Sequence, residues 1–250
     1  MAKIKAEKRE ETPAFSLCRD AFKRSMYLRH IVLLTFLNLV WYNSVIIMKS
    51  KYNLLEQLKV LPYFNKNTVS QLGLQLGIKN STVSTYISRF IKYKEIYQVK
   101  KGMYVSAAFA DARRSTDSYR LYLANILRSP SYVSSWTALQ YYNLTTEVIH
   151  STTSVSLKVT RNYVTKIGTF QYQSIDKRAF CDFQLLKSDF DFFIATPSKA
   201  IFDLLYFKTR GFRGYSRRDV LMMAEDLRID VDELSKDELT KLYLMLKKYE

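Results

Sequence analysis

The hydrophobic positions between residues 53 and 92 follow a helical period three times in succession. The first predicted helix covers Asn53–Tyr63, and its apolar stripe is Leu54, Leu55, Leu58 and Leu61. The second begins at an Asn67 or Thr68 cap, and its expected buried face is Val69, Leu72 and Leu76. The third begins at an Asn80 or Ser81 cap, and the residues expected to point inward are Val83, Ile87, Phe90 and Ile91.

A glycine turn and a basic hairpin complete this block. Gly77 would supply the left-handed residue of a tight turn between the second and third helices, and Ile78 would fill the space between them. Ile96–Val99 and Met103–Val105 read as two strands joined by the turn Lys100-Lys101-Gly102. Helices, turn and hairpin in this order predict a winged helix-turn-helix over residues 48–106.

Residues 107–250 predict a mixed α/β domain that ends in helices. Residues 107–125 form a connector that leads into a helix, and a further helix opens at Tyr132 and stops around Asn143. Alternation of polar with apolar or β-branched residues predicts strands over Val148–Val159, Val164–Ile175 and Asp189–Ile194.

Three helix starts follow these strands. Thr196-Pro197 combines a hydroxyl cap with proline at the first helical position, and the helix over residues 198–207 would bury Ala200, Ile201, Leu204 and Leu205. Ser216 with Asp219, and Ser235 with Glu238, have the spacing of capping boxes. The predicted fold class is therefore α+β, with a winged helix-turn-helix, a mixed α/β C-terminal domain and C-terminal helices.

The charge of the chain is concentrated in the first of these two regions. The formal net charge is +16 with a pI near 9.7, which favours a polyanionic partner such as nucleic acid or an acidic membrane surface. Residues 48–106 hold ten Lys/Arg against two acids, a net charge of +8, whereas residues 107–250 hold twenty-one against seventeen. The predicted winged helix is thus where a polyanion would bind.

The third helix would present short hydroxylated residues followed by basic ones on its outward face. Helix-turn-helix proteins bring the start of this helix to base edges, so Thr82 and Ser84 are candidates for sequence preference. Arg89 and Lys92 are expected at phosphates, where charge gives affinity but little sequence information. The complete candidate DNA-binding set is Lys66, Lys79, Asn80, Ser81, Thr82, Ser84, Thr85, Arg89, Lys92, Lys100 and Lys101. A three-helix scaffold used for protein contact is the competing interpretation.

Side chains arranged for catalysis or metal binding are scarce. His150 stands alone near a strand start, and His30 precedes an apolar segment. Asp189 and Asp191 would project from one face of a strand, but neither a third ligand nor a glycine-rich phosphate loop accompanies them. We therefore expect a non-enzyme that has no metal and no cofactor.

The first 47 residues share no pattern with the rest of the chain, and they are treated as an N-terminal extension. Ile31–Met48 is uncharged with basic flanks and has about the length that spans a bilayer. Three interpretations stay open: a membrane anchor, a helix that packs or is disordered, and a true translation start at Met48. The two cysteines, Cys18 and Cys181, lie outside any metal-ligand spacing and indicate free thiols in the cytosol.

Three segments together resemble the AbiEi-type antitoxins, which are transcriptional regulators of abortive-infection (phage defence) type IV toxin–antitoxin systems. These segments are the basic block that ends in KKGMYV, then YVSSWTALQYYNLTTE, then IATPSKAIFDLLY, and the resemblance covers about residues 48–206. It implies a winged helix that binds double-stranded operator DNA and represses its own operon. It also implies a C-terminal domain that counteracts a nucleotidyltransferase-like toxin without requiring a stable complex.

One position departs from that family. Its last helix usually carries an acid before the lysine, as in PEKA, whereas this chain has Ser198 before Lys199. Lys199 and Asp203 lie at i, i+4 and would pair on one helix face. An alternative function is a winged-helix transcription factor whose C-terminal domain senses a ligand or a protein, with a membrane tether if residues 31–48 are translated and inserted.

Overall fold

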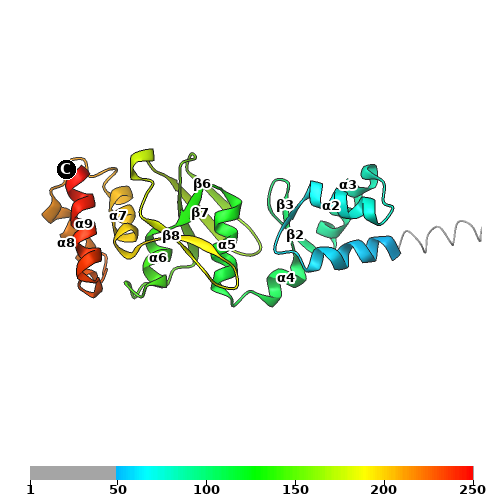
Figure 1. Ribbon diagram of the computed structural model, residues 1–250, viewed down its shortest axis with the longest axis horizontal. Coiled ribbons are helices and arrows are strands. Elements are labelled where there is room, and N and C mark those ends of the chain that lie inside the picture. The colour runs from blue at the N-terminus through cyan, green and yellow to red at the C-terminus, as the bar shows by residue number, and fades with distance from the viewer. Residues whose placement is uncertain (1–48, 250) are drawn as a thin grey trace, which may run out of the picture. The chain divides into compact units, whose positions relative to one another are not determined.

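The computed structural model describes residues 49–249, and the chain divides into two compact units between Leu55 and Glu56 (Figure 1). Residues 49–55 of the first unit are helical. The expectations for Ile31–Met48, His30 and Cys18 lie outside the described residues. Residues 56–249 belong to the second unit, which is mixed α+β and contains a mixed sheet.

The second unit begins with two helices beside a small antiparallel sheet. After helical residues 56–59, the chain forms β1 (Phe64–Asn65), α2 (Lys66–Gln75), α3 (Asn80–Lys92), β2 (Ile96–Lys100) and β3 (Met103–Ser106). The strand order is β1-β3-β2, with both pairs antiparallel. A short helix, α4 (Ala107–Ala112), follows. The predicted hairpin and its glycine turn at Gly102 (φ +79°) are confirmed.

The helix caps differ from the sequence prediction. Asn65 caps α2, accepting a hydrogen bond from the Thr68 N–H (3.0 Å), because pairing of β1 with β3 keeps the chain extended up to that residue. Asn67 and Thr68 therefore lie inside the helix. Helix α3 follows Lys79 without a side-chain cap, so Asn80 and Ser81 also lie within the helix and are free of a capping role.

Helix α2 packs on α3 through a glycine and not through the leucines that the pattern predicted. Gly73, not Leu72 or Leu76, is the buried position beside Val69, and a Cβ at Gly73 would lie 3.5 Å from Val83 Cγ2. The buried stripe of α3 is Val83, Tyr86, Ile87 and Phe90. Ile91 is 37% exposed, so the prediction that it points inward is wrong.

The turn between these helices has the predicted conformation. Gly77 has φ +70°, in the left-handed region that favours glycine. Ile78 is buried, and its N–H donates to the Gly73 carbonyl oxygen (2.8 Å).

A six-stranded mixed sheet organises residues 107–249. Its strands are β4 (Ser131–Val133), β5 (Ser151–Ser156), β6 (Arg161–Val164), β7 (Thr169–Ser174), β8 (Phe183–Leu186) and β9 (Phe192–Ala195), in the order β6-β7-β5-β4-β9-β8. Strands β5 and β7 are parallel, as are β4 and β9, and the other neighbours are antiparallel.

Helices cover both faces of this sheet. Those of the C-terminal region are α5 (Asp117–Leu127), α6 (Ser135–Tyr141), α7 (Pro197–Lys208), α8 (Arg217–Asp226) and α9 (Lys236–Tyr249), with single 3₁₀ turns at Lys177–Ala179 and Val231–Glu233. The Tyr172 hydroxyl of β7 donates to the Ala124 carbonyl of α5 (2.6 Å), whereas its neighbour Gln171 borders α6 and α7. Because strand side chains alternate, α5 lies on one face and the α6–α7 pair on the other. Figure 1 shows α8 and α9 beyond α7.

Several expectations for this region need correction. Residues 131–133 form β4, so the helix predicted from Tyr132 begins three residues later, at Ser135. The strand predicted from Asp189 begins at Phe192, and β8 was not predicted at all. The start of α7 at Pro197 and the capping box of Ser216 with Asp219 are confirmed.

A buried ion pair links α7 to the strands. The predicted pairing is confirmed: Lys199 Nζ lies 2.6 Å from Asp203 Oδ1, with both side chains fully buried. The hydroxyls of Tyr132 (3.0 Å) and Ser134 (2.7 Å) donate to Asp203 Oδ2, and Lys199 Nζ also donates to the Ala179 carbonyl (2.7 Å). Hydrogen bonds therefore satisfy both charged groups inside the core.

Among residues 49–249, no helix is both long and apolar enough to cross a membrane.

Candidate nucleic-acid interface

One face of α3 is polar and exposed along its whole length. Ser81, Ser84 and Thr85 near its start are exposed, and their hydroxyls make no hydrogen bond with another described residue. Thr82 is half-buried, so it is less available to a ligand than its neighbours. Ser88 uses its hydroxyl within the helix, donating to the Ser84 carbonyl (3.0 Å). The start of α3 therefore presents three unengaged hydroxyls, and its end presents two cations.

Those cations have no acidic partner. Six exposed basic residues of this region form no ion pair with any residue in 49–249: Lys66, Lys79, Arg89, Lys92, Lys94 and Lys101. Elsewhere in the second unit some cations are paired, for example Arg120 with Asp117 (2.9 Å) and Lys187 with Asp191 (2.7 Å). The charge around α3 is therefore available to an external anion and is not neutralised within the protein.

The hairpin separates its two lysines. Lys101 lies exposed at the turn, where a phosphate could reach it. Lys100 is half-buried, and its Nζ donates to the Leu127 carbonyl (2.7 Å) at the C-terminal end of α5. A helix C-terminus carries partial negative charge, so this contact stabilises the lysine where it is. The two lysines, predicted as one pair, thus have different surroundings.

Sequence reasoning missed Lys94. This exposed residue follows α3 in the left-handed conformation (φ +58°) and adds a cation just past the helix end. Its proximity to Lys92 in the sequence was the available signal. Asn80, by contrast, was predicted as a cap and is an exposed residue of the first turn of α3, beside the Lys79 N-cap.

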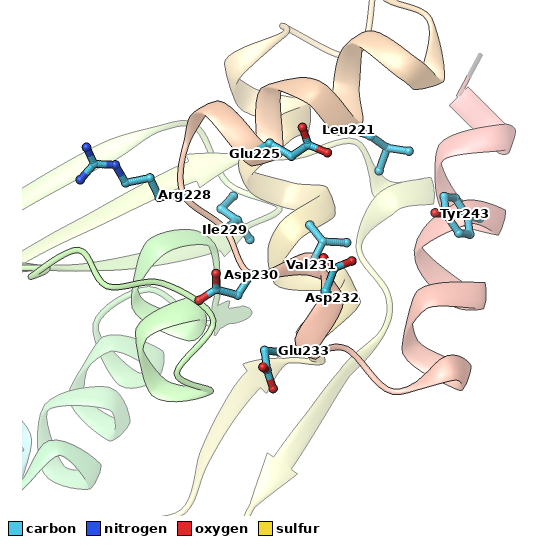
Figure 2. A pocket seen from close by; sticks show the side chains of 9 residues that line it. All are labelled: Leu221, Glu225, Arg228, Ile229, Asp230, Val231, Asp232, Glu233 and Tyr243. Atoms are coloured by element: carbon cyan, nitrogen blue, oxygen red, sulfur yellow. The ribbon is translucent and has the colours of Figure 1, made fainter.

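A groove between α8 and α9 has the opposite charge. Its volume is about 550 Å³, and it is lined by Leu221, Glu225, Arg228, Ile229, Asp230, Val231, Asp232, Glu233 and Tyr243. Figure 2 shows the four carboxylates of Glu225, Asp230, Asp232 and Glu233, and an Arg228 side chain that points away from them. A polyanion would be repelled by this groove, in contrast to the exposed face of α3.

The residues considered for catalysis do not converge. His150 is exposed and precedes β5. Asp189 and Asp191 lie in the β8–β9 loop, because β9 begins only at Phe192. Asp191 accepts hydrogen bonds from Lys187 Nζ (2.7 Å) and the Ser188 N–H (3.2 Å), which hold the pKa of Asp191 below its ordinary value. Within residues 49–249, no group of three His, Cys, Asp or Glu could hold a metal ion.

Compared with models of known protein families and with curated proteins, the chain has no match.

Proposed function

We propose that residues 48–106 form a winged helix-turn-helix that binds double-stranded operator DNA, and that the protein is a transcriptional autorepressor. One observation carries this proposal: the exposed face of α3 combines unengaged hydroxyls at its start with cations that lack acidic partners. The helix order, the Gly77 turn and the β2–β3 hairpin support the same assignment. Ser81, Ser84 and Thr85 would approach base edges, and Arg89, Lys92 and Lys101 would contact phosphates.

We further propose that residues 107–250 provide antitoxin activity against a nucleotidyltransferase-like toxin, as the resemblance to AbiEi-type proteins implies. The two C-terminal segments that carry the resemblance form one buried network, since Tyr132 and Ser134 of the first donate to Asp203 of the second. Tyr142 also joins them, because its hydroxyl donates to the Ala195 carbonyl (2.9 Å). This network supports treating the segments as one unit.

An acid from another helix lies next to Ser198, the position at which this family usually carries an acid. Glu238 of α9 accepts hydrogen bonds from the Ser198 N–H (3.1 Å) and the Ser198 hydroxyl (2.7 Å). Its carboxylate therefore stabilises the N-terminus of α7, where an acid at residue 198 would also act. The Ser235 hydroxyl still caps α9 by accepting the Glu238 N–H (3.2 Å), but the reciprocal half of the predicted capping box is replaced by this contact.

Fluorescence anisotropy would test DNA binding, with a duplex from immediately upstream of the gene and a scrambled duplex of equal length. Affinity for both should fall with salt, at a slope of about −0.9 per phosphate contacted. Arg89→Ala and Lys101→Ala should each weaken binding to both duplexes and reduce that slope by about one. Ser84→Ala should change the ratio of the two affinities more than either slope, and Thr82→Ala should act in the same direction.

Lys187→Ala is the matched control, because this exposed lysine is far from α3 in sequence and is already paired with Asp191. Lys100→Ala should lower stability and leave the salt slope nearly unchanged, since its ammonium is bound to Leu127. Salt-independent binding, or equal effects of the Lys101 and Lys187 substitutions, would refute the proposed interface.

Co-expression with the adjacent gene tests the antitoxin role. That role fails if the gene is harmless alone or remains toxic beside this one.

A further inference from the structure

A small cavity lies between the sheet and the α6–α7 pair. Its volume is about 220 Å³, and it is lined by Ser135, Trp136, Thr153, Gln171, Gln173, Leu204, Phe207 and Lys208. This volume equals about seven water molecules at roughly 30 Å³ each. It is smaller than the ~300–1,000 Å³ of pockets for drug-sized ligands, so a ligand would fit in part and extend to the open rim.

One wall of the cavity contains a buried hydroxyl without a partner. Ser135 is 2% exposed, and its Oγ makes no hydrogen bond with any residue in 49–249. Burying an unsatisfied hydroxyl costs about 1–3 kcal/mol. Ser106, Ser131 and Ser154 have buried hydroxyls of the same kind, but of these four serines only Ser135 lines the cavity. A ligand in the cavity would satisfy this group.

Two glutamines that line the cavity are also unengaged. Gln171 and Gln173 project from β7 on the same face of the sheet, and their carboxamides have no hydrogen-bond partner in the described part of the chain. Each carboxamide offers two donors and one acceptor oxygen, which is the pattern that reads the edge of a nucleobase. Two such groups beside Ser135 favour a ligand rich in ring nitrogens and exocyclic oxygen or amino groups.

The remaining lining residues define the rest of the ligand. Trp136 packs on the core with part of its surface and lines the cavity, so its indole ring offers an apolar face for stacking. Leu204 and Phe207 extend this apolar surface. Lys208, at the exposed end of α7, has no acidic partner among the described residues, and none of the lining residues is acidic. A planar ring that carries an anionic group matches this arrangement.

Hydrogen bonds hold the start of α6 against β5 without a ligand. The Thr153 hydroxyl donates to the Ser134 carbonyl (2.6 Å) and accepts the Thr137 N–H (3.1 Å). The Thr153 N–H in turn donates to the Thr137 hydroxyl (2.8 Å). These bonds fix the start of α6 to β5, so Ser135 and Trp136 are presented on a rigid support.

We propose that this cavity binds a mononucleotide, with the base against Trp136 and the carboxamides of Gln171 and Gln173 and the phosphate at Lys208. Nucleotide binding would make residues 107–249 a sensing domain, and the assignment does not depend on DNA binding by α3. The cavity contains no general base or metal site, so the proposal concerns binding without turnover.

Trp136 provides the readout. The chain has two tryptophans, and a Trp41→Phe background leaves Trp136 as the only indole. Titration with AMP, GMP, CMP and UMP should quench its emission with at least one of them, at micromolar to millimolar Kd. Ribose 5-phosphate, which lacks the base, should not bind. The corresponding nucleoside, which lacks the phosphate, should bind about tenfold more weakly, and the difference should disappear at high salt.

Three variants test the assigned contacts, with affinity also measured by calorimetry. Gln171→Ala and Lys208→Ala should each weaken nucleotide binding by about tenfold, whereas Gln98→Ala and Lys187→Ala, both outside the cavity, should not. Ser135→Ala should weaken binding and leave the urea midpoint of the empty protein unchanged or higher, because the hydroxyl has no partner to lose. If Ser135 had only a structural role, Ser135→Ala would lower the urea midpoint and leave nucleotide binding unchanged.

The proposal is overturned if no mononucleotide binds up to millimolar concentration, or if ribose 5-phosphate binds equally well. Binding that is unchanged in both Gln171→Ala and Lys208→Ala would also overturn it. The same variants should retain wild-type affinity for the upstream duplex when no nucleotide is present. Failure of DNA binding with intact nucleotide binding would therefore refute only the proposed winged helix.

Discussion

The buried pair of Lys199 and Asp203 predicts a large and pH-dependent loss of stability when its cation is removed. Lys199→Met keeps the length of the side chain but leaves the Asp203 carboxylate fully buried with only the hydroxyls of Tyr132 and Ser134. Breaking one partner of a buried pair costs about 3–5 kcal/mol. That is a large fraction of the ~5–15 kcal/mol by which domains are stable.

The sign of the pH dependence follows from the surroundings of Asp203. Burial raises the pKa of this carboxyl, and Lys199 and the hydrogen bonds oppose that rise. In Lys199→Met the pKa rises further, so the folded variant binds a proton that the unfolded chain has already released. Stability of the variant should therefore fall as pH rises above the ordinary carboxyl value of about 4, by at most ~1.4 kcal/mol per pH unit.

Urea unfolding at about pH 5 and about pH 8 measures both effects. The difference between wild type and Lys199→Met should be larger at the higher pH. Lys187→Met is the matched control, since Lys187 and Asp191 form the same i, i+4 pair at 2.7 Å but with side chains 77% and 40% exposed. Water already solvates that pair, so its loss should change stability little. A pH-independent cost, or equal costs at the two sites, would show that the pair in the core is not ionised as described.

Two further substitutions test packing and capping. Gly73→Ala should stabilise the protein by about 0.5–1 kcal/mol, because its Cβ would make ordinary contacts with Val83 and Ile78. Gly77→Ala should destabilise it by about 1 kcal/mol, because Gly77 has a positive φ. Thermal unfolding measures both changes, and midpoints that shift in the same direction would contradict them. Burial acts to raise the pKa of Glu238, but hydrogen bonds from Lys241 and Ser198 lower it below its ordinary value, so Glu238→Gln should cost about 1 kcal/mol near pH 7. That cost should shrink as pH falls through the lowered pKa of Glu238 and wild type loses the charge, and a constant difference in urea midpoint would argue against a carboxylate at α7.

Local signals predicted the parts of the fold that depend on neighbouring residues. Gly77 marked a left-handed turn, Pro197 marked the first turn of α7, and Ser216 with Asp219 marked a capping box, because each conformation is set within a few residues. The charge count likewise pointed to the region around α3 as the basic surface.

Tertiary contacts decided what the sequence could not indicate. Strand β4 was predicted as a helix start, because a strand of three residues is too short to show a periodicity of its own. Its pairing with β5 on one side and β9 on the other makes it a strand. Glu238 had the spacing of a cap for its own helix, yet its carboxylate binds Ser198, forty residues away in the chain. The cavity beside Ser135 depends on α6, α7, β5 and β7 together, so no single segment could reveal it.

The bond from Lys100 to the Leu127 carbonyl couples the β2–β3 hairpin to the last turn of α5. A phosphate that bound this ammonium would break the bond to Leu127, and the last turn of α5 would lose its counter-charge. The free energy of that lost contact would be subtracted from the free energy of DNA binding. Linkage makes this exchange reciprocal. While its bond to Leu127 is intact, Lys100 adds nothing to DNA affinity; an event that breaks this bond would free the ammonium for a phosphate and increase the affinity of the hairpin for DNA.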